Sequence, residues 1–556
     1  MQYVFFILIG VLILVIWSIY NEKSIVKKLK NQLKSEWASI PEEEYSSEKL
    51  ESLQSYYKSV KNDLLDVDDI TWNDLDMDEL YMLMNNTQSA MGEEYLYALL
   101  RQPCFSEEEL KERNRLMNFF HSREDLRVKI QASLHQIGKL NHISVFEYSN
   151  RLGEEKAKSN LPHYIMAFGL ILSVVLIFIN PGAGGILTFL FFVNNTFRYF
   201  VEKAKIDKYL TVYSFILRLL NKSESIIRMD IPEIKMYMDA IKQDISLFQN
   251  FRRGAGILVS KKVSGSLMDA ILDYIRMLTH IDLIKYNSML SFFKENRIAL
   301  NRIFANVGFL DSMIAAASFR DKLDYYCIPE LTKSNRPSLS VNELYHPLIA
   351  DPVPNSITEN RSVLLTGSNA SGKSTFIKTL AINAILSQTI DTSPSRGYKA
   401  SYFVIYSSMA LRDSIFRNES YYIVEIKSLK RILDRINKDI PMLCFIDEVL
   451  RGTNTQERIA ASSRILVSLA KKNVLCFAAT HDIELTHILE NCYSNCHFQE
   501  HIVDQQILFD YKLYRGRATS RNAIKLLGLL GYSQDIIDAA EKAAEEFTVD
   551  GEWKKI

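Results

Sequence analysis

The chain has 556 residues, enough for two or three domains, and its 66 basic residues are balanced by 66 acidic ones. This balance excludes an overall basic excess as an argument for nucleic-acid binding. The six cysteines are scattered, and Cys444 and Cys476 lie within apolar stretches. Such a pattern is typical of reduced, buried thiols, as found in the cytosol.

The first predicted element is an apolar run from Tyr3 to Ile19 that contains no charged residue. A run of this length can cross the hydrocarbon layer as a helix. No basic segment precedes it and no small-residue cleavage site ends it, so we interpret residues 1–20 as an uncleaved anchor rather than a signal peptide. By the positive-inside rule, the N-terminus faces out and the basic residues after the run are cytoplasmic: Lys23, Lys27, Lys28 and Lys30.

Helical patterns follow this anchor. Residues 21–66 combine charge with helical spacing of apolar residues and predict a juxtamembrane helical region. The acidic stretch Asp63–Glu79 is interpreted as a solvated face. Residues 67–162, with the helical patterns Leu80–Arg101 and Glu107–Leu140, form the first part of a predicted all-α core.

Residues 163–200 are predicted to form a transmembrane hairpin. Two apolar runs, Tyr164–Ile179 and Ile186–Phe197, flank a turn at Asn180–Gly185, and neither run contains a charged residue. The absence of charge argues against an ion or proton pathway. Basic residues outside both runs place both ends in the cytoplasm: Lys156, Lys158, Arg198, Lys203 and Lys205. A buried hairpin of a soluble domain is the alternative interpretation.

The second part of the helical core covers residues 201–333, where apolar residues again recur at spacings of three and four. Ser334–Pro337 marks a boundary. Residues 334–556 alternate between strand and helix patterns, as an α/β nucleotide-binding domain requires.

The most specific motif lies near the start of this last domain. A predicted buried strand, Val363–Leu365, precedes it, and a predicted helix, Phe376–Ser387, follows it. The motif fits G-x-x-x-x-G-K-[ST], whose backbone N–H groups surround phosphate oxygens at a helix N-terminus. Lys373 would reach the β- and γ-phosphates of ATP, and Ser374 would hold Mg²⁺. The predicted loop comprises Gly367, Ser368, Asn369, Ala370, Ser371, Gly372, Lys373, Ser374 and Thr375.

Two further apolar strands each end in polar residues that suit ATP hydrolysis. Met442–Ile446 is followed by two adjacent carboxylates: Asp447 would bind Mg²⁺ through its water shell, and Glu448 would orient and polarise the attacking water. Val474–Ala479 leads to His481, which could contact the γ-phosphate. Each of these motifs alone is weak evidence. Their order along the chain, with the glycine-rich loop first, predicts an ATPase.

Separated motifs make the chain similar to the MutS mismatch-repair ATPases. The similarity covers the chain from about Leu75 to Ala544, interrupted once by the apolar hairpin. The segments that resemble the family are Asn85–Gly92, Val307–Ala315, Thr366–Thr375, Asp413–Glu425, Phe445–Thr453, Ala479–Leu485 and Tyr511–Leu513.

This resemblance implies an ABC-type P-loop ATPase domain that follows an all-α lever domain, and an ATP-gated homodimer. Ser420 falls at the position that reaches the γ-phosphate bound by the partner subunit. His346 and Pro347 fall where the adenine base would be framed. With three predicted transmembrane helices added, the expected protein is anchored in the cytoplasmic (inner) membrane with its ATPase domain in the cytoplasm.

Three functions remain open at this point. Family analogy favours binding of DNA at mismatches or other structures, in repair or a related transaction. Residues Asn21–Leu75 leave no room for a mismatch-reading domain, and they contain no Phe-x-Glu element. The missing domain, the zero net charge and the hairpin favour an ATP-driven membrane switch acting on a protein or lipid partner. A third function, export, would need a lined pathway that the short apolar runs do not offer.

Overall fold

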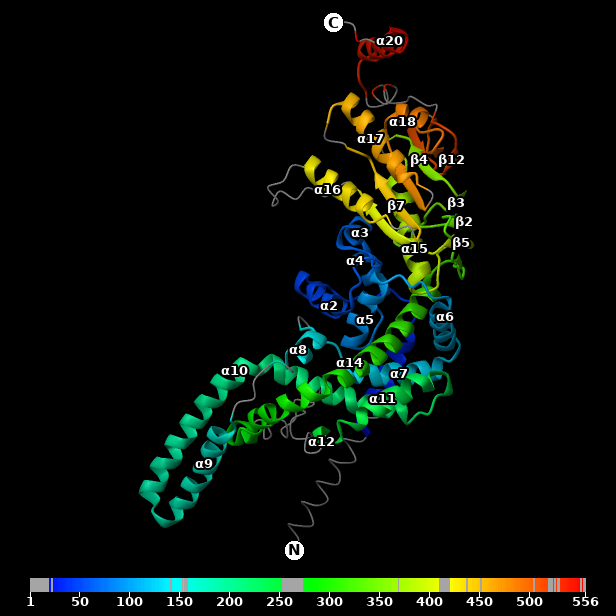
Figure 1. Cartoon of the computed structure of the whole chain (residues 1–556). Helices are drawn as coiled ribbons and strands as arrows, with labels where there is room; N and C mark the ends of the chain where they lie inside the picture. The colour runs from blue at the N-terminus through cyan, green and yellow to red at the C-terminus, as the bar shows by residue number, and fades with distance from the viewer. Residues whose placement is uncertain are drawn as a thin grey trace. The chain divides into compact units, whose positions relative to one another are not determined.

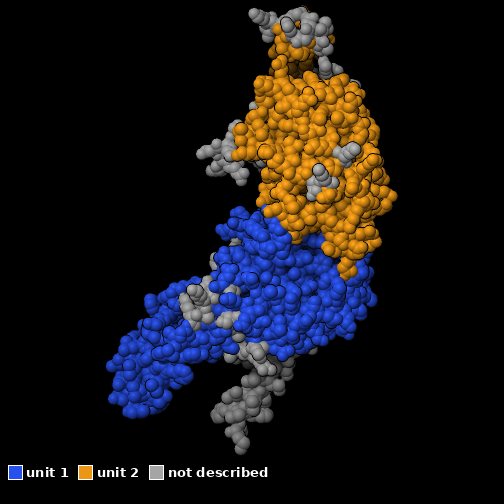
Figure 2. Space-filling model, viewed as in Figure 1, with its two compact units in different colours: residues 1–61, 82–99, 113–322 blue, residues 62–81, 100–112, 323–556 orange. Residues whose placement is uncertain are grey.

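The computed structural model describes residues 20–21, 24–140, 143–152, 154, 159–252, 274–368, 370–409, 421–436, 439–450, 453–471, 473–503, 506–518, 524, 527, 531–550 and 553. The predicted anchor at Tyr3–Ile19 and the predicted site residues Asn369 and Ser420 lie outside this part of the chain. The chain forms two compact units (Figure 2). Unit 1 comprises residues 1–61, 82–99 and 113–322, and unit 2 comprises residues 62–81, 100–112 and 323–556.

Unit 1 is helical throughout its described part. Its core is formed by apolar residues of long helices, such as Phe215 and Leu219 in the middle and Ile303 and Met313 near the end. Three helices, α4 (Met77–Met84), α5 (Ala90–Arg101) and α6 (Glu107–Ser122), contribute residues to both units. The others are α2 (Ser47–Val60), α7 (Glu124–Ile137), α8 (Val145–Leu152), α9 (Leu161–Ile179), α10 (Pro181–Ile227), η1 (Pro232–Ile234), α11 (Lys235–Ser246), α12 (Gln249–Arg252) and α14 (Ile281–Lys322).

Helices α9 and α10 pair as a hairpin, as Figure 1 shows. The turn follows from its sequence: the Asn180 side chain accepts a hydrogen bond from Ala183 N at 3.2 Å, and Pro181 occupies the first helical position. Small residues let the helices approach closely, since a Cβ on Gly169 would lie 2.3 Å from the Phe191 ring. The outer surface is apolar and exposed, and Phe178 retains 87% of its accessible surface.

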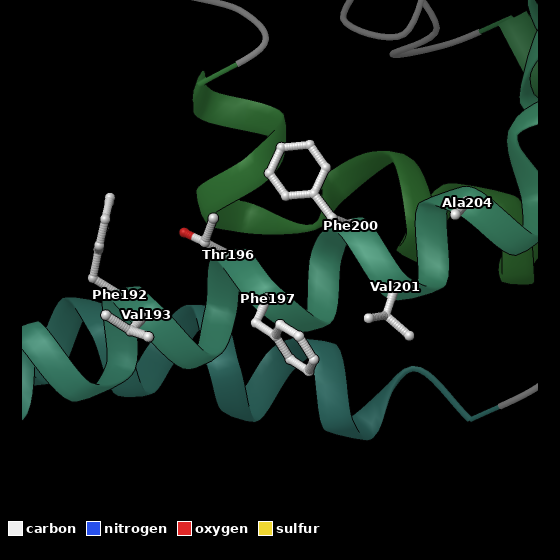
Figure 3. A pocket seen from close by; sticks show the side chains of 7 residues that line it. All are labelled: Phe192, Val193, Thr196, Phe197, Phe200, Val201 and Ala204. Atoms are coloured by element: carbon white, nitrogen blue, oxygen red, sulfur yellow. The ribbon is translucent and has the colours of Figure 1, made fainter.

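An apolar hollow of about 600 Å³ lies on α10, with the lining side chains shown in Figure 3. Only Thr196 among them is polar. The lining residues are Phe192, Val193, Thr196, Phe197, Phe200, Val201 and Ala204.

Two helices in the described part are long and apolar enough to cross a membrane. Only 6% of the apolar stretch in α9 is buried. By contrast, 67% of the apolar stretch in Phe292–Lys322 is buried, and this segment is the part of α14 that belongs to the core of unit 1. The predicted third span, Ile186–Phe197, is not one of the two. Its apolar run is short, and polar residues at its end, Asn194 and Asn195, dilute it. Among the described residues the structure therefore supplies one exposed apolar helix of membrane-spanning length, α9. Of the other two predicted spans, Ile186–Phe197 does not reach that length, and Tyr3–Ile19 lies outside the described residues.

Unit 2 contains mixed sheets covered by helices. The larger sheet has the order β12-β9-β4-β8-β7-β6, in which all neighbours except β12 and β9 run parallel. Its strands are β4 (Ser362–Thr366), β6 (Val404–Ser408), β7 (Met442–Asp447), β8 (Val474–Ala479), β9 (Tyr493–His497) and β12 (Tyr514–Arg515). Strands β4, β6 and β8 are buried along their whole length, which explains the apolar runs that they contain: Val363–Leu365, Val404–Tyr406 and Val474–Ala479.

The second sheet has the order β1-β5-β2-β3, formed by β1 (Glu330–Thr332), β5 (Gly397–Ser401), β2 (Leu339–Leu344) and β3 (Asn355–Glu359); β10 (Glu500–Val503) and β11 (Gln506–Phe509) form a separate pair. The helices of unit 2 include α3 (Asp69–Asp74), α15 (Lys373–Thr389), α16 (Tyr421–Asp434), α17 (Thr455–Leu469), α18 (Ile483–Ile488) and α20 (Gln534–Asp550). Apolar residues of α16, α17 and the larger sheet share one core, represented by Ile432, Leu466 and Cys476.

The segment at residues 62–81 differs from its prediction. Sequence analysis divided it between the juxtamembrane and helical-core regions and interpreted its acidic residues as a solvated face. The structure groups it with unit 2. Asp66 and Trp72 are buried, and Trp72 donates to Asp78 at 2.8 Å. Three of its carboxylates, those of Asp68, Asp74 and Asp76, interact with partners more than 300 positions away in the sequence, a relation that local patterns do not encode.

Candidate nucleotide site

The larger sheet brings the predicted motifs to one edge. Leu365 at the end of β4 is in register with Ala479 at the end of β8, and Ala479 is also in register with Asp447 at the end of β7. Backbone hydrogen bonds continue past the strands: Thr480 N donates to Leu365 O at 2.9 Å, and Glu448 N donates to Ala479 O at 3.0 Å. Because the strands are parallel, their carboxyl ends present all three motifs together.

The loop after β4 requires glycine at two positions. Gly367 has φ +145°, and a Cβ there would lie 2.6 Å from Phe498 O. Gly372 has φ +105° and precedes α15 directly. Both conformations are unfavourable for residues with a side chain. The turn thereby directs the backbone into the N-terminus of a 17-residue helix.

The donors of this loop fit a phosphate group. Lys373, the first residue of α15, is buried, and its Nζ donates to Gly367 O and Ser368 O at 2.8 Å each. The Ser371 hydroxyl is buried, and no hydrogen-bond partner for it is found in the described part of the chain. An ammonium group, a hydroxyl without a partner and a helix N-terminus are the groups that bind phosphate.

The remaining loop residues are accessible or held by neighbours. Ser368 Oγ donates to Glu500 at 2.7 Å, and Ala370 adopts a positive φ of 64°. Ser374 and Thr375 are exposed on the first turn of α15. The hydroxyl of Ser374 and the half-buried carboxylate of Asp447 supply oxygen ligands of the type that Mg²⁺ prefers.

Glu448 and His481 are in direct contact. His481 Nε2 lies 3.1 Å from Glu448 Oε1, and their side chains are 37% and 16% exposed. Glu448 has a positive φ of 61°, so the backbone after β7 turns through the left-handed region, which is unfavourable for a residue with a side chain. The residue after His481 is also fixed, because Asp482 forms two hydrogen bonds with Arg458 of α17 at 2.9 and 2.6 Å.

His346 lies in a buried environment. Its ring is 8% exposed, and Nδ1 accepts a hydrogen bond from Leu348 N at 3.3 Å. Burial, with the nearby Lys378 charge, lowers the pKa of His346 to about 4, so the ring is neutral. His346 Nδ1 therefore stabilises the turn that contains Pro347. The predicted contact of His346 and Pro347 with the adenine base stays a prediction.

Tyr511 is a site neighbour to which sequence analysis assigned no role. Its Cδ1 lies 3.2 Å from the place where a Cβ on Gly372 would stand, so the ring lies against the phosphate loop. The side chain is 45% exposed, and its ring stacks with Phe509 at 6.0 Å. The segment Tyr511–Leu513 had been recognised as similar to MutS proteins, and an exposed aromatic within it was the available signal.

The chain is similar to known MutS proteins over part of its length. The family model for MutS domain V matches residues 363–548. MutS protein homolog 4 of Mus musculus is 31% identical over 268 residues, which cover 45% of this chain and 27% of that protein. The DNA mismatch repair protein MutS of Leptospira interrogans is 27% identical over 300 residues, which cover 51% of this chain and 34% of that protein. DNA mismatch repair protein MSH3 of Debaryomyces hansenii is 26% identical over 297 residues, 49% and 28% of the two chains. The matched stretch thus spans about a third or less of each relative.

Proposed function

We propose that this chain is a member of the MutS family and that its unit 2 is a P-loop ATPase of the ABC type whose ATP hydrolysis controls DNA binding. The whole-protein activity proposed here is a mismatch-type or related DNA transaction carried out by a membrane-anchored dimer. Its cofactors would be ATP and Mg²⁺.

The observation that carries this proposal is the convergence of three motifs at one sheet edge. Lys373, Glu448 and His481 come from three different strand ends, and register places these ends side by side. A phosphate-binding loop without a neighbouring carboxylate could bind a nucleotide without hydrolysing it. The Asp447–Glu448 pair at the adjacent strand end supports hydrolysis.

Each residue has a defined role in this proposal. The backbone N–H groups of the loop and the ammonium of Lys373 would bind the phosphates. Ser374 and Asp447 would hold Mg²⁺, which supplies charge neutralisation to the phosphates when bound. Glu448 would orient and deprotonate water. Tyr511 offers an aromatic face beside the loop, and His346 and Pro347 remain the predicted frame of the base.

The contact between His481 and Glu448 suggests a resting arrangement. While His481 Nε2 lies 3.1 Å from Glu448 Oε1, the carboxylate shares its oxygen with the ring instead of with water. His481 can leave this contact to donate to a phosphate oxygen. Glu448 is then available as a base, so engagement of the γ-phosphate and activation of water would be linked.

We propose a homodimer as the hydrolytically active form. Ser420 would reach the nucleotide held by the partner's loop, which gives two shared sites across a twofold axis. The γ-phosphate then supplies the difference in contacts that favours the closed dimer, since a ligand shifts an equilibrium only by its differential affinity. Hydrolysis would remove that difference and let the helical unit 1 relax.

DNA is the proposed target of this movement. Two of the relatives are named DNA mismatch repair proteins, and this supports a DNA transaction. The net charge of zero means that phosphate contacts would come from local groups of basic residues. The alternative, a switch that acts on a protein or lipid without DNA, is one outcome of the test below.

We further propose that the protein is attached to the cytoplasmic membrane. Helix α9 has 19 residues and would extend about 28 Å, close to the thickness of the hydrocarbon core. Its exposed apolar side chains on a hairpin held by small residues suit lipid. Together with the apolar run Tyr3–Ile19, this arrangement would leave unit 2 and the remainder of unit 1 in the cytoplasm.

The experiment that tests the function is an ATPase assay on full-length, detergent-solubilised protein. Hydrolysis is measured alone and with duplex, branched and single-stranded DNA over a salt series. Stimulation by DNA that declines steeply as salt rises supports the proposal, because phosphate contacts release counterions. The Lys373→Ala variant is the control for contaminating ATPases.

Two results would contradict it. Hydrolysis that is indifferent to every nucleic acid would exclude the DNA role and leave the membrane switch. A wild-type protein that neither binds nor hydrolyses ATP would exclude both functions.

A further inference from the structure

The segment Asp68–Asp76, which contains α3, is here called the acidic strap. It belongs to unit 2, although nearly 300 residues separate it from the phosphate loop. Its carboxylates contact three elements of the nucleotide-binding unit. None of these contacts is needed to explain the proposed roles of Lys373, Glu448 or His481.

The first contact is with β6, the edge strand of the larger sheet. Asp74 Oδ2 accepts hydrogen bonds from Ser407 Oγ at 2.6 Å and from Met409 N at 3.0 Å. Thr71 Oγ1 accepts a further bond from Ser407 N at 3.0 Å. The strap therefore satisfies donors at the edge of β6, which no other strand covers in the described part of this sheet.

The position of these bonds along β6 is informative. Ser408, the last residue of β6, is in register with Ile446 of β7, so Met409 follows β6 at the same sheet edge where Asp447 ends β7. Asp74 thus fixes the strand end beside the carboxylates proposed to act on Mg²⁺ and water. A shift of this end would move the neighbouring strand end as well, because the strands share backbone hydrogen bonds.

The second contact is with α15. Asp76 Oδ2 lies 2.6 Å from Lys378 Nζ, and both side chains are about a quarter exposed. Lys378 lies five positions after Lys373, on the helix whose N-terminus faces the phosphate loop. A third contact pairs Asp68 with Arg431 of α16, and Arg431 also donates to Ser407 O. The strap thereby connects β6, α15 and α16.

We propose that the acidic strap is a positioning element for ATP hydrolysis, in which Asp74 holds the end of β6 beside Asp447 and Asp76 holds α15 behind Lys373. The assignment rests on the proposed ATPase function. Neither carboxylate would touch the nucleotide. Their effect would be to keep the phosphate loop and the hydrolytic carboxylates in fixed relation, and rate is sensitive to such placement.

The test compares steady-state ATP hydrolysis of full-length wild type with Asp74→Ala and Asp76→Ala. We expect kcat to fall by about tenfold in Asp74→Ala while KM stays within about twofold, since nucleotide binding depends on the loop itself. Asp76→Ala should show a smaller loss of the same kind. Asp74→Asn should retain most activity, because its amide oxygen can accept both hydrogen bonds.

Asp69→Ala is the matched control. Asp69 lies on the same helix as Asp74 and forms an ion pair with Arg101 of α5 at 2.6 Å, but its side chain is 75% exposed. This variant should hydrolyse ATP as wild type does. If Asp74→Ala does not fold, Ser407→Ala removes only the 2.6 Å bond and should show the same fall in kcat with an unchanged KM.

An active wild type with Asp74→Ala or Ser407→Ala at full kcat overturns the positioning role, even if the melting temperature falls, because the strap would then only cover the sheet edge. A loss of kcat in Asp69→Ala equal to that in Asp74→Ala overturns it too. An inactive wild type, by contrast, overturns the proposed ATPase function itself, and the strap's role with it.

Discussion

Arg458 of α17 binds Asp482, the residue after His481, through two hydrogen bonds of 2.9 and 2.6 Å. Their side chains are 25% and 11% exposed. Nearby carboxylates, Asp482 first and Glu448 to a lesser extent, raise the pKa of the Arg458 guanidinium. This ion pair fixes the turn that carries His481 against α17, the helix that follows Asp447 and Glu448 along the chain.

The first prediction concerns this pair. Arg458→Ala should lower kcat for ATP by about tenfold, because the His481 turn loses its bidentate anchor while the phosphate loop stays intact. Nucleotide affinity, measured by a fluorescent ATP analogue, should change by less than about twofold. Arg464→Ala, at an exposed position of the same helix, is the control. Equal kcat in the two variants would show that the anchor is dispensable.

The second prediction separates binding from hydrolysis. Lys373→Ala should abolish nucleotide binding, since the residue provides the buried ammonium of the loop. Glu448→Gln should bind ATP normally but lose hydrolysis by at least about a hundredfold, because the amide cannot take a proton from water. It should also accumulate as an ATP-bound dimer, measured by light scattering. Normal turnover in Glu448→Gln would remove this residue from the role of base.

The third prediction concerns a helix cap in unit 1. The buried Asp311 carboxylate of α14 accepts hydrogen bonds from Ser89 N at 2.8 Å, Ser89 Oγ at 2.6 Å and Gln88 N at 3.1 Å, and so caps α5. Asp311→Ala should cost about 2 kcal/mol in the free energy of unfolding, because buried N–H groups lose their acceptor. Urea unfolding measures this, with the exposed Asp239→Ala as control. Equal stability of both variants would contradict the cap's importance.

The fourth prediction is a pH dependence of stability. Glu94 is buried and accepts hydrogen bonds from Ser144 Oγ and Val145 N at 2.9 Å each. Burial, the largest effect, raises the pKa of Glu94 to about 8, from an ordinary value of 4.5. Between these values the folded state holds a proton that the unfolded chain releases. The contribution of the protonated Glu94 to stability is therefore fully present below the ordinary pKa of 4.5, and it is lost as pH rises through about 8.

From pH 6 to pH 8 the free energy of unfolding should fall by about 2 kcal/mol through this group. Glu94→Gln should remove that fall, and Glu147→Gln on α8 should keep it. Urea unfolding at several pH values, followed by tryptophan fluorescence, is the measurement. Identical pH profiles for wild type and Glu94→Gln would show that Glu94 does not hold the proton.

The fifth prediction concerns membrane attachment. A variant without residues 1–20 should remain in the membrane fraction after alkaline extraction, because the α9–α10 hairpin retains its exposed apolar surface. Phe168 and Leu172 are 67% and 71% exposed. In the truncated variant, the substitutions Phe168→Lys and Leu172→Lys should release the protein from the membrane fraction. Release of the truncated protein with an unchanged hairpin would show that α9 does not hold the protein in lipid.

The sequence alone determined the local parts of this protein. The loop Gly367–Thr375 and the strand before Asp447 could be predicted because glycine spacing and unbroken apolar runs are local signals. The order of these motifs also predicted a MutS protein, and the family model for MutS domain V matches residues 363–548. The apolar α9 was equally visible, since composition over 19 residues defines it.

Only the tertiary structure decided which distant residues meet. The pairing of Arg458 with Asp482, the cap that Asp311 places on α5 and the contact of Asp74 with β6 join positions 24, 222 and 335 residues apart. A charged residue looks the same in sequence whether it is solvated or bound to a distant partner. Its role depends on burial and on the approach of other elements, and both arise only when the chain has folded.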